Sequence, residues 1–190
     1  NMMGDALKEL KEIPGFADMV SKMSSNPLIA VLIGTIITGV IQSSSAVIGI
    51  IQTLFASNAI GLDVALGLLF GANIGTCVTS LLASLGGSLA SKRTALYHVL
   101  FNISVSLAFL VFLKPYELMI NTLATALNAN DMMTIAIAHF AFNFIGMLIF
   151  APLIKPISKL LSKIIPGKEE MFVDMGQMQL QEHLITSFPA

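Results

Sequence analysis

Four consecutive polar residues, Gln42-Ser43-Ser44-Ser45, interrupt an apolar stretch that runs from Leu28 to Phe55. The stretch is long enough to enter a membrane, where an unpaired hydroxyl or amide costs roughly 2 to 7 kcal/mol. One amide and three hydroxyls offer hydrogen-bond donors and acceptors without a fixed charge, which suits a small ion. Helix N-termini pointing at such a run favour an anion, whereas carbonyl ends and hydroxyl oxygens hold a hard cation such as sodium. We therefore predict an ion-binding site at this run.

A second polar interruption, Gly71-Ala72-Asn73-Ile74-Gly75-Thr76, lies in the next apolar segment. Its two glycines favour an unwound or sharply bent backbone, and Asn73 and Thr76 add polar side chains. Non-helical backbone at membrane depth is tolerated where it is buried in protein or lines a watery cavity. The two interruptions thus predict one shared cavity. The alternative is that the small residues only pack helices closely, although packing requires neither a glutamine nor an asparagine.

The composition indicates a membrane protein. The chain has 55% hydrophobic and 11% charged residues, with a mean hydropathy of +0.85, whereas about a quarter of the residues of soluble domains are charged. Between Lys22 and Lys92 the only acid or base is Asp63. The net charge of −1 and the scattered basic residues exclude a nucleic-acid partner. The single cysteine, Cys77, excludes an internal disulfide and a multi-cysteine metal site.

Four apolar segments must position these residues: 28–56, 62–85, 94–113 and 132–153. Each is near the roughly 20 residues that span a bilayer core. Residues 28–41 alone would make about 21 Å of helix, against a core of about 30 Å. We therefore expect a re-entrant hairpin, with 28–41 descending, 46–56 returning and the polar run at its tip. A continuous spanning helix is the alternative.

A histidine motif occurs twice in the second half of the chain. His98-Val99-Leu100-Phe101-Asn102 recurs as His139-Phe140-Ala141-Phe142-Asn143, and each copy is followed at the same distance by a lysine and a proline. The two segments are predicted to be related helices. No carboxylate stands at helical spacing beside either histidine, so helix packing or hydrogen bonding is favoured over metal binding.

The charges predict an orientation and the outer segments. Lys92 and Arg93 fall on the same side as the lysines of 155–168, whether the first segment is a hairpin or a span, and the positive-inside rule makes that side cytoplasmic. The excess of basic residues on the cytoplasmic side is slightly larger if the first segment spans the membrane, because a span also places Lys8, Lys11 and Lys22 on that side. We expect an N-terminal juxtamembrane segment (1–27), a membrane domain (28–153), an amphipathic interfacial helix (154–168) and the start of a cytoplasmic C-terminal region (169–190).

The polar motifs together resemble the sodium-dependent phosphate cotransporter family. The resemblance lies in Thr38 to Ala46, in Gly71 to Thr76 and in His98 to Asn102, in the family's order and approximate spacing, and covers about 28–113. Members of that family carry the glutamine and serine motif in two inverted repeats, and this chain has it once. Val47 to Gln52 is similar to the second repeat, and Gln181 to Ala190 is similar to the segment that leads bacterial members into a cytoplasmic helical domain.

The resemblance implies an all-α membrane protein, one inverted-repeat half with a re-entrant hairpin, a broken transmembrane helix and two further transmembrane helices. It implies sodium-coupled symport of inorganic phosphate across the cell (inner) membrane, with no cofactor and with sodium as the coupling ion. The partners would be phosphate, sodium, the bilayer and either the missing first repeat or a second copy of the chain, as in a homodimer. By the same resemblance the site comprises Gln42, Ser43, Ser44, Ser45, Asn73, Gly75 and Thr76, with Thr38, Gln52 and Thr79 as further candidates.

No lysine or arginine lies near either interruption, so neutral donors, helix ends and the bound sodium would have to hold the phosphate. Two other function classes remain open. An intramembrane serine hydrolase lacks its motif, because no Gly-x-Ser-x-Gly surrounds the serines. A membrane assembly module would use the small residues for helix packing alone. We predict a transporter and not an enzyme.

Overall fold

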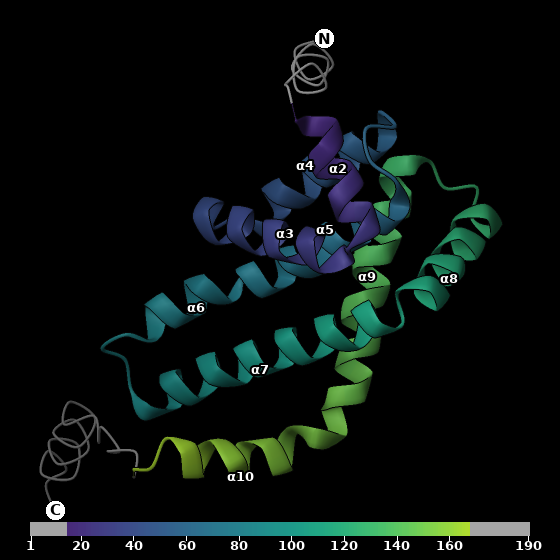
Figure 1. Cartoon of the computed structure of the whole chain (residues 1–190). Coiled ribbons are helices and arrows are strands. Elements are labelled where there is room, and N and C mark those ends of the chain that lie inside the picture. Colours follow the sequence, from purple (N-terminus) through teal and green to yellow (C-terminus); the bar gives the residue numbers. More distant parts are fainter. Residues whose placement is uncertain (1–14, 168–190) are drawn as a thin grey trace, which may run out of the picture.

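The computed structural model describes residues 15–167, and every secondary-structure element in that range is helical (Figure 1). The predicted C-terminal region 169–190, most of the segment 1–27 and the last residue of the predicted interfacial helix lie outside the described residues. The elements are α2 (Phe16–Ser25), α3 (Pro27–Ile41), α4 (Ser44–Ala56), α5 (Leu62–Gly75), α6 (Cys77–Ser84), α7 (Leu89–Val111), α8 (Leu113–Ala126), α9 (Asp131–Phe150), the 3-10 turn η1 (Ala151–Leu153) and α10 (Ile154–Ile164).

Three helical stretches of the described chain are long and apolar enough to cross a membrane: Leu62–Ser84, Leu89–Val111 and Asp131–Ile164. They correspond to the second, third and fourth predicted apolar segments. The first predicted segment forms two shorter helices, because α3 has 15 residues and α4 has 13. The all-helical class and the division of the first segment are confirmed. Entry of α3 and α4 into a membrane stays a prediction.

Local sequence explains where α3 and α4 begin and end. The Asn26 side chain accepts a hydrogen bond from the Leu28 N–H (3.1 Å), and Pro27 occupies the first helical position. Gln42 has a left-handed backbone (φ 54°) and ends α3, and the extended Ser43 caps α4. A continuous helix through 42–43 is therefore not what the chain forms.

The contact between α3 and α5 is the most extensive helix pairing in the described chain. Gly67, Gly71 and Gly75 recur every fourth residue and form one face of α5. A Cβ placed on Gly71 would overlap the Val31 carbonyl and stand 2.8 Å from the Thr35 nitrogen, and one on Gly75 would stand 2.6 Å from the Thr35 carbonyl oxygen. The two backbones touch directly, as in other small-residue helix contacts.

This contact corrects our expectation of an unwound backbone at Gly71 to Thr76. The helical chain does divide at Thr76, between α5 and α6, but 71–75 are helical and Thr76 keeps right-handed helical angles (φ −60°, ψ −24°). Glycine's missing side chain is used here for close approach of α3, not for backbone freedom.

Four aromatic rings join the other helices to α5. Phe70 stacks on Phe142 of α9 with ring centroids 5.0 Å apart, and Phe109 of α7 meets Tyr116 of α8 edge-on at 4.7 Å. Phe109 also packs against Phe142 at 5.0 Å. Buried aromatic pairs of this geometry contribute beyond their buried area. The cluster fixes α7, α8 and α9 around the centre of α5.

Helix α8 was not expected from the sequence. It buries Leu113, Tyr116, Ile120 and Ala124 and exposes most of the residues between them. The spacing of three and four residues is typical of an amphipathic helix and was present in the sequence. The pattern is obscured because the segment follows an apolar span and carries Lys114, Pro115 and Glu117 near its start.

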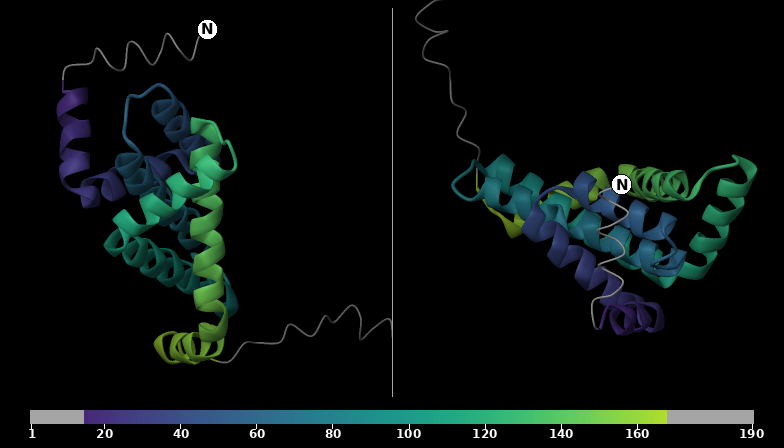
Figure 2. Two further views of the ribbon diagram at one scale, coloured as in Figure 1. Left: turned by 90° about the vertical axis from the view of Figure 1, so that its right-hand side faces the viewer. Right: turned by 90° about the horizontal axis from the view of Figure 1, so that it is seen from above.

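Lys92, Arg93 and the lysines of α10 lie at one end of the molecule. The Arg93 guanidinium donates to the Ile165 carbonyl (2.9 and 3.2 Å) and to the Gly167 carbonyl (3.1 Å), which ties the start of α7 to the end of α10. After η1 the chain turns sharply away from α9 and α10 runs across its end (Figure 2). Lys92, Arg93 and the α10 lysines thus share one side, as predicted. That this side is cytoplasmic stays a prediction.

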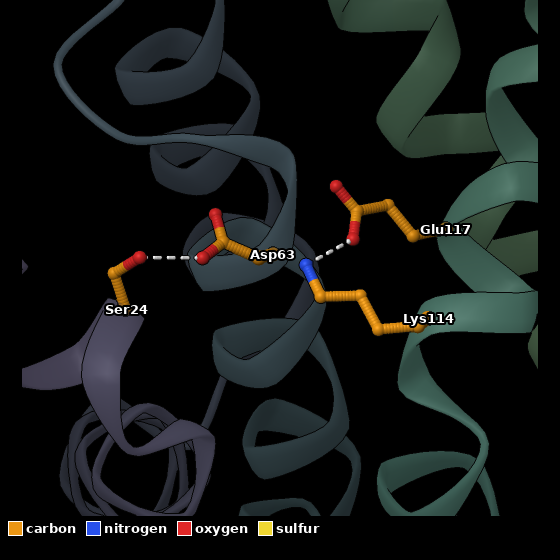
Figure 3. A network of polar contacts seen from close by, with 4 residues as sticks. All are labelled: Ser24, Asp63, Lys114 and Glu117. Atoms are coloured by element: carbon orange, nitrogen blue, oxygen red, sulfur yellow. Dashed lines mark hydrogen bonds and ion pairs between the residues drawn. The ribbon is translucent and has the colours of Figure 1, made fainter.

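Two polar contacts involving acidic residues lie near the beginning of α5 (Figure 3). The Ser24 hydroxyl donates to Asp63 at 2.6 Å, and Lys114 forms an exposed ion pair with Glu117 at 2.9 Å. The hydrogen bond to Glu117 raises the pKa of Lys114. The Ser24 contact joins α2 to the beginning of α5, so the single ionisable residue between Lys22 and Lys92 lies at a helix end.

We expect Gly71→Ala to destabilise the protein, because the new methyl group meets the Val31 carbonyl and neither backbone can move alone. Overpacking of this kind costs roughly 1 to 3 kcal/mol. Gly49→Ala in α4 is the matched control: its Cβ meets nothing within 4 Å, and alanine is the better helix former. Thermal unfolding in neutral detergent measures both. A Gly71→Ala protein as stable as Gly49→Ala would contradict the direct backbone contact.

Candidate functional site

The predicted tip lies where two helix ends of opposite polarity meet. The carbonyl end of α3 stops at Gln42, and the N–H end of α4 begins at Ser44. The first N–H groups and last carbonyls of a helix lack partners within it. The junction therefore offers free donors with partial positive charge from α4 and free acceptors with partial negative charge from α3.

The tip side chains are accessible and largely unpaired within the described residues. Gln42 and Ser45 are exposed, and Ser43 and Ser44 are half-buried. The Ser43 hydroxyl accepts a long bond from the Ala46 N–H (3.4 Å) and lies 3.4 Å from the Ser45 hydroxyl. Side-chain hydrogen bonds of Gln42 and Ser44 are absent from the described part of the chain. These groups remain available to a ligand.

Thr38 lies one turn before the tip and is fully buried. Its carbonyl accepts the Gln42 N–H at 2.7 Å, and its Cβ stands 2.7 Å from where a Cβ of Gly75 would lie. The Thr38 hydroxyl is the one buried side-chain polar atom of the described residues that has no hydrogen-bond partner. Such atoms are few in native proteins, and each calls for a physical explanation. The structure thus brings Thr38 and Gly75 together at the base of the tip.

Asn73 points elsewhere. Its amide nitrogen donates to the Asn143 side-chain oxygen of α9 at 3.3 Å, and it is almost wholly buried. At 3.6 residues per turn, Asn73 and Gly75 are about 160° apart around α5. The two residues therefore do not face one cavity within this chain: Gly75 packs on α3, and Asn73 faces α9.

The remaining predicted site residues are Thr76, Thr79 and Gln52. The Thr76 hydroxyl donates to the Ala72 carbonyl at 2.9 Å within its own helix, and Thr79 is exposed on α6. The Gln52 amide donates to the Met132 carbonyl at 3.1 Å and so joins α4 to the start of α9. In the described chain Gln52 acts as a helix-to-helix contact.

The two histidine motifs make the same local bond. The Asn102 and Asn143 side chains each donate at 2.9 Å to the carbonyl of the histidine four residues earlier. His98 Nδ1 also lies 2.8 Å from the Ser80 hydroxyl of α6. No group of three or more metal-ligating side chains occurs among residues 15–167. His98 thus forms the kind of helix-to-helix hydrogen bond that the sequence analysis favoured for it.

Asn143 is the polar residue that our site prediction missed. It bonds both to Asn73 and to the His139 carbonyl, so it connects the second interruption to α9. The signal was present in the repeated histidine motif. We interpreted the repeat as evidence of related helices and did not place its asparagine beside α5.

Comparison with known proteins identifies the family. The family model described as Na+/Pi-cotransporter matches residues 1–152. "Uncharacterized protein YqeW" of Bacillus subtilis is 34% identical over 154 residues, which are 80% of this chain and 48% of the relative. "Putative inorganic phosphate export protein YjbB" of Escherichia coli is 26% identical over 166 residues, 87% of this chain and 30% of the relative.

A human relative shares a shorter region. "Sodium-dependent phosphate transport protein 2B" is 35% identical over 65 residues, which are 34% of this chain and 9% of the relative. No solved structure matches the chain. The chain thus spans about half or less of the length of these curated relatives.

The family match agrees with the arrangement of the helices. Three stretches suited to crossing a membrane and a family of transporters indicate a multi-pass membrane protein. The family is defined by transport and is not an enzyme class. The match covers the tip, the α3–α5 contact and both histidine motifs. This chain belongs to the Na+/Pi-cotransporter family.

Proposed function

We propose that the protein is a sodium-coupled symporter of inorganic phosphate and that this chain supplies one half of its midplane site. The observation that carries the proposal is the tip. In a chain of the Na+/Pi-cotransporter family, a glutamine and three serines stand where a helix carbonyl end meets a helix N–H end. Just behind them lies the unpaired Thr38 hydroxyl.

The proposed arrangement assigns each ion to matching chemistry. Phosphate accepts hydrogen bonds from the first N–H groups of α4, from the serine hydroxyls and from the Gln42 amide. Sodium takes the oxygens of the α3 carbonyl end, with the Thr38 hydroxyl among its candidate ligands. No basic side chain neutralises the phosphate, so the sodium ion does, and binding of the two ions becomes coupled.

The tip reaches the membrane midplane if α3 and α4 form a re-entrant hairpin. Their apolar exposed residues support this, because Leu32, Ile36 and Val40 of α3 are 60%, 64% and 79% exposed, which water would disfavour. The cell membrane and a cytoplasmic C-terminus are part of the same proposal. So is a partner that completes the site, either another repeat or a second copy of the chain.

Sodium coupling predicts that an inward sodium gradient drives labelled phosphate into proteoliposomes above the level reached at equilibrium. Sodium attraction supplies the energy for burying the anion, so replacing the sodium gradient with an equal potassium gradient should abolish accumulation. Equal uptake with the two cations would refute sodium coupling. Uptake of a different anion in place of phosphate would refute the substrate.

The direction of transport has a second candidate, since the E. coli relative is named as a phosphate export protein. Vesicles preloaded with phosphate test this in the same preparation. For the symporter, an inward sodium gradient should retain internal phosphate and an outward gradient should release it. Phosphate release that ignores the direction of the sodium gradient would favour export without sodium coupling.

Gln42→Ala should lower phosphate affinity about 10- to 100-fold, because a hydrogen bond to a charged group contributes roughly 1.5 to 3 kcal/mol. Asn121→Ala removes another exposed amide, on α8, and serves as the control. Concentration-dependent uptake gives both values. Unchanged uptake by Gln42→Ala, together with weaker oligomer formation, would instead support the assembly module.

Thr38→Val should raise the sodium concentration for half-maximal uptake about 2- to 10-fold, the value of one neutral hydrogen bond of roughly 0.5 to 1.5 kcal/mol. Its unfolding temperature should stay the same or rise, because the change removes an unpaired buried hydroxyl and keeps the shape. Thr35→Val is the control: that hydroxyl bonds the Val31 and Gly71 carbonyls, at 2.8 and 3.2 Å. It should lose stability without changing the sodium dependence. The reverse pattern would remove Thr38 from the site.

A further inference from the structure

A groove at the basic end of the molecule shares no residue with the proposed transport site. One cavity of about 250 Å³ lies between α7 and α10 and is lined by Arg93, Thr94, Tyr97, Ile154, Ser158 and Leu161. A second, of about 220 Å³, is lined by Tyr97, Phe101, Met147, Phe150, Ala151 and Ile154. Tyr97 and Ile154 line both, so the two cavities adjoin each other on a path from α10 toward α9, and together they are called the groove.

The groove changes from polar to apolar along its length. At its α10 end the hydroxyls of Thr94, Tyr97 and Ser158 form no hydrogen bond with other residues of 15–167. At its α9 end the lining is aromatic and aliphatic, with Phe101 and Phe150 packed edge-to-face at 5.0 Å. A ligand that fits this groove has a polar head and a hydrocarbon tail.

The charge around the polar end indicates the sign of the head. Lys155, Lys159 and Lys163 recur every fourth residue and so share one face of α10. Two of them directly follow the groove-lining Ile154 and Ser158. Within residues 15–167 these lysines form no ion pair, and the segments 77–111 and 151–167 contain no acidic residue. Arg93 adds its charge at the groove while bonding the Ile165 and Gly167 carbonyls.

The apolar side of α10 is also open. Leu160 and Ile164 are 50% and 54% exposed, while Leu161 is buried against α7. An amphipathic helix with lysines on one face and open aliphatic residues on the other lies stably at a lipid headgroup boundary. Clusters of lysines beside membrane-crossing helices attract anionic lipids.

We propose that α7, η1 and α10 form a binding site for an anionic phospholipid. One acyl chain lies along Tyr97, Phe101 and Phe150, and the phosphate of the headgroup lies among Lys155, Lys159 and Ser158. The Lys155 and Lys159 ammonium groups donate to the phosphate oxygens. The site would secure α10 at one membrane surface independently of the transported ions.

Native mass spectrometry of the whole chain in neutral detergent tests the site. Phosphatidylglycerol and phosphatidylcholine with identical acyl chains are titrated in parallel. The whole chain is used so that the negative charges of Glu169 and Glu170, which follow α10 in the sequence, are included in the measurement. We expect phosphatidylglycerol to bind more tightly. In Lys155→Gln/Lys159→Gln its affinity should fall about 25-fold, at about fivefold per lysine, toward that of phosphatidylcholine. Lys22→Gln, an exposed lysine on α2, is the matched control and should bind as the unmodified chain does.

A second variant tests the tail. Ala151→Phe places a ring in the apolar end of the groove and should weaken both lipids equally, leaving their affinity ratio unchanged. Equal affinity of the unmodified chain for the two lipids would overturn the proposal. So would displacement of phosphatidylglycerol by millimolar inorganic phosphate, which would indicate a free-anion site. A change of oligomeric mass in Ala151→Phe would also overturn it, because a second copy would then cover the groove.

Discussion

The direct backbone contact between α3 and α5 is the constraint on which the other features depend. Three glycines at every fourth position of α5 let α3 approach until its atoms occupy the space that side chains on α5 would fill. In a bilayer, lipid tails offer apolar surfaces as good as those of a neighbouring helix, so association must come from close packing and polar contacts. The Thr35 hydroxyl adds such a contact by bonding the Gly71 carbonyl across the pair. This contact holds α3 in place, and α3 in turn holds the tip.

Helix α5 serves a different partner on each side. One face is all glycine and carries α3, while the other presents Phe70 to the aromatic cluster and Asn73 to α9. A helix that is buried on nearly every side shows little amphipathic pattern, and α5 is buried at almost all of its positions. Contacts on both of its faces therefore fix the position of α5. Helix α3 exposes apolar side chains on its other side and depends on α5 for its placement, whereas α4 packs on both α5 and α9.

The residues that were predicted correctly are those whose effects are local. The apolar runs predicted the spans by their length, and the polar run at 42–45 predicted the division of the first segment. In the structure, Pro27, Gln42 and Ser43 set the boundaries of that division through their immediate neighbours. The direction in which a side chain points depends on distant partners. The spacing of Gly71 and Gly75 is equally compatible with an unwound helix and with a tight helix pair, and only the presence of the Thr35 backbone opposite both glycines decides. Asn73 likewise could not be assigned to α9 without its partner Asn143.

Asn73 and Gly75 face different helices, and this bears on how the proposed site could hold a phosphate ion at the tip. A phosphate ion held by neutral donors needs a compensating charge nearby, and the described chain places no basic side chain in contact with the tip. Within the described residues the tip presents helix ends and hydroxyls, and its side-chain hydrogen bonds are those among Ser43, Ser45 and the Ala46 N–H. Asn73 faces α9 and cannot close it. Under the proposed function, the sodium ion and a partner that approaches the exposed apolar face of α3 and α4 would supply the second surface of the site.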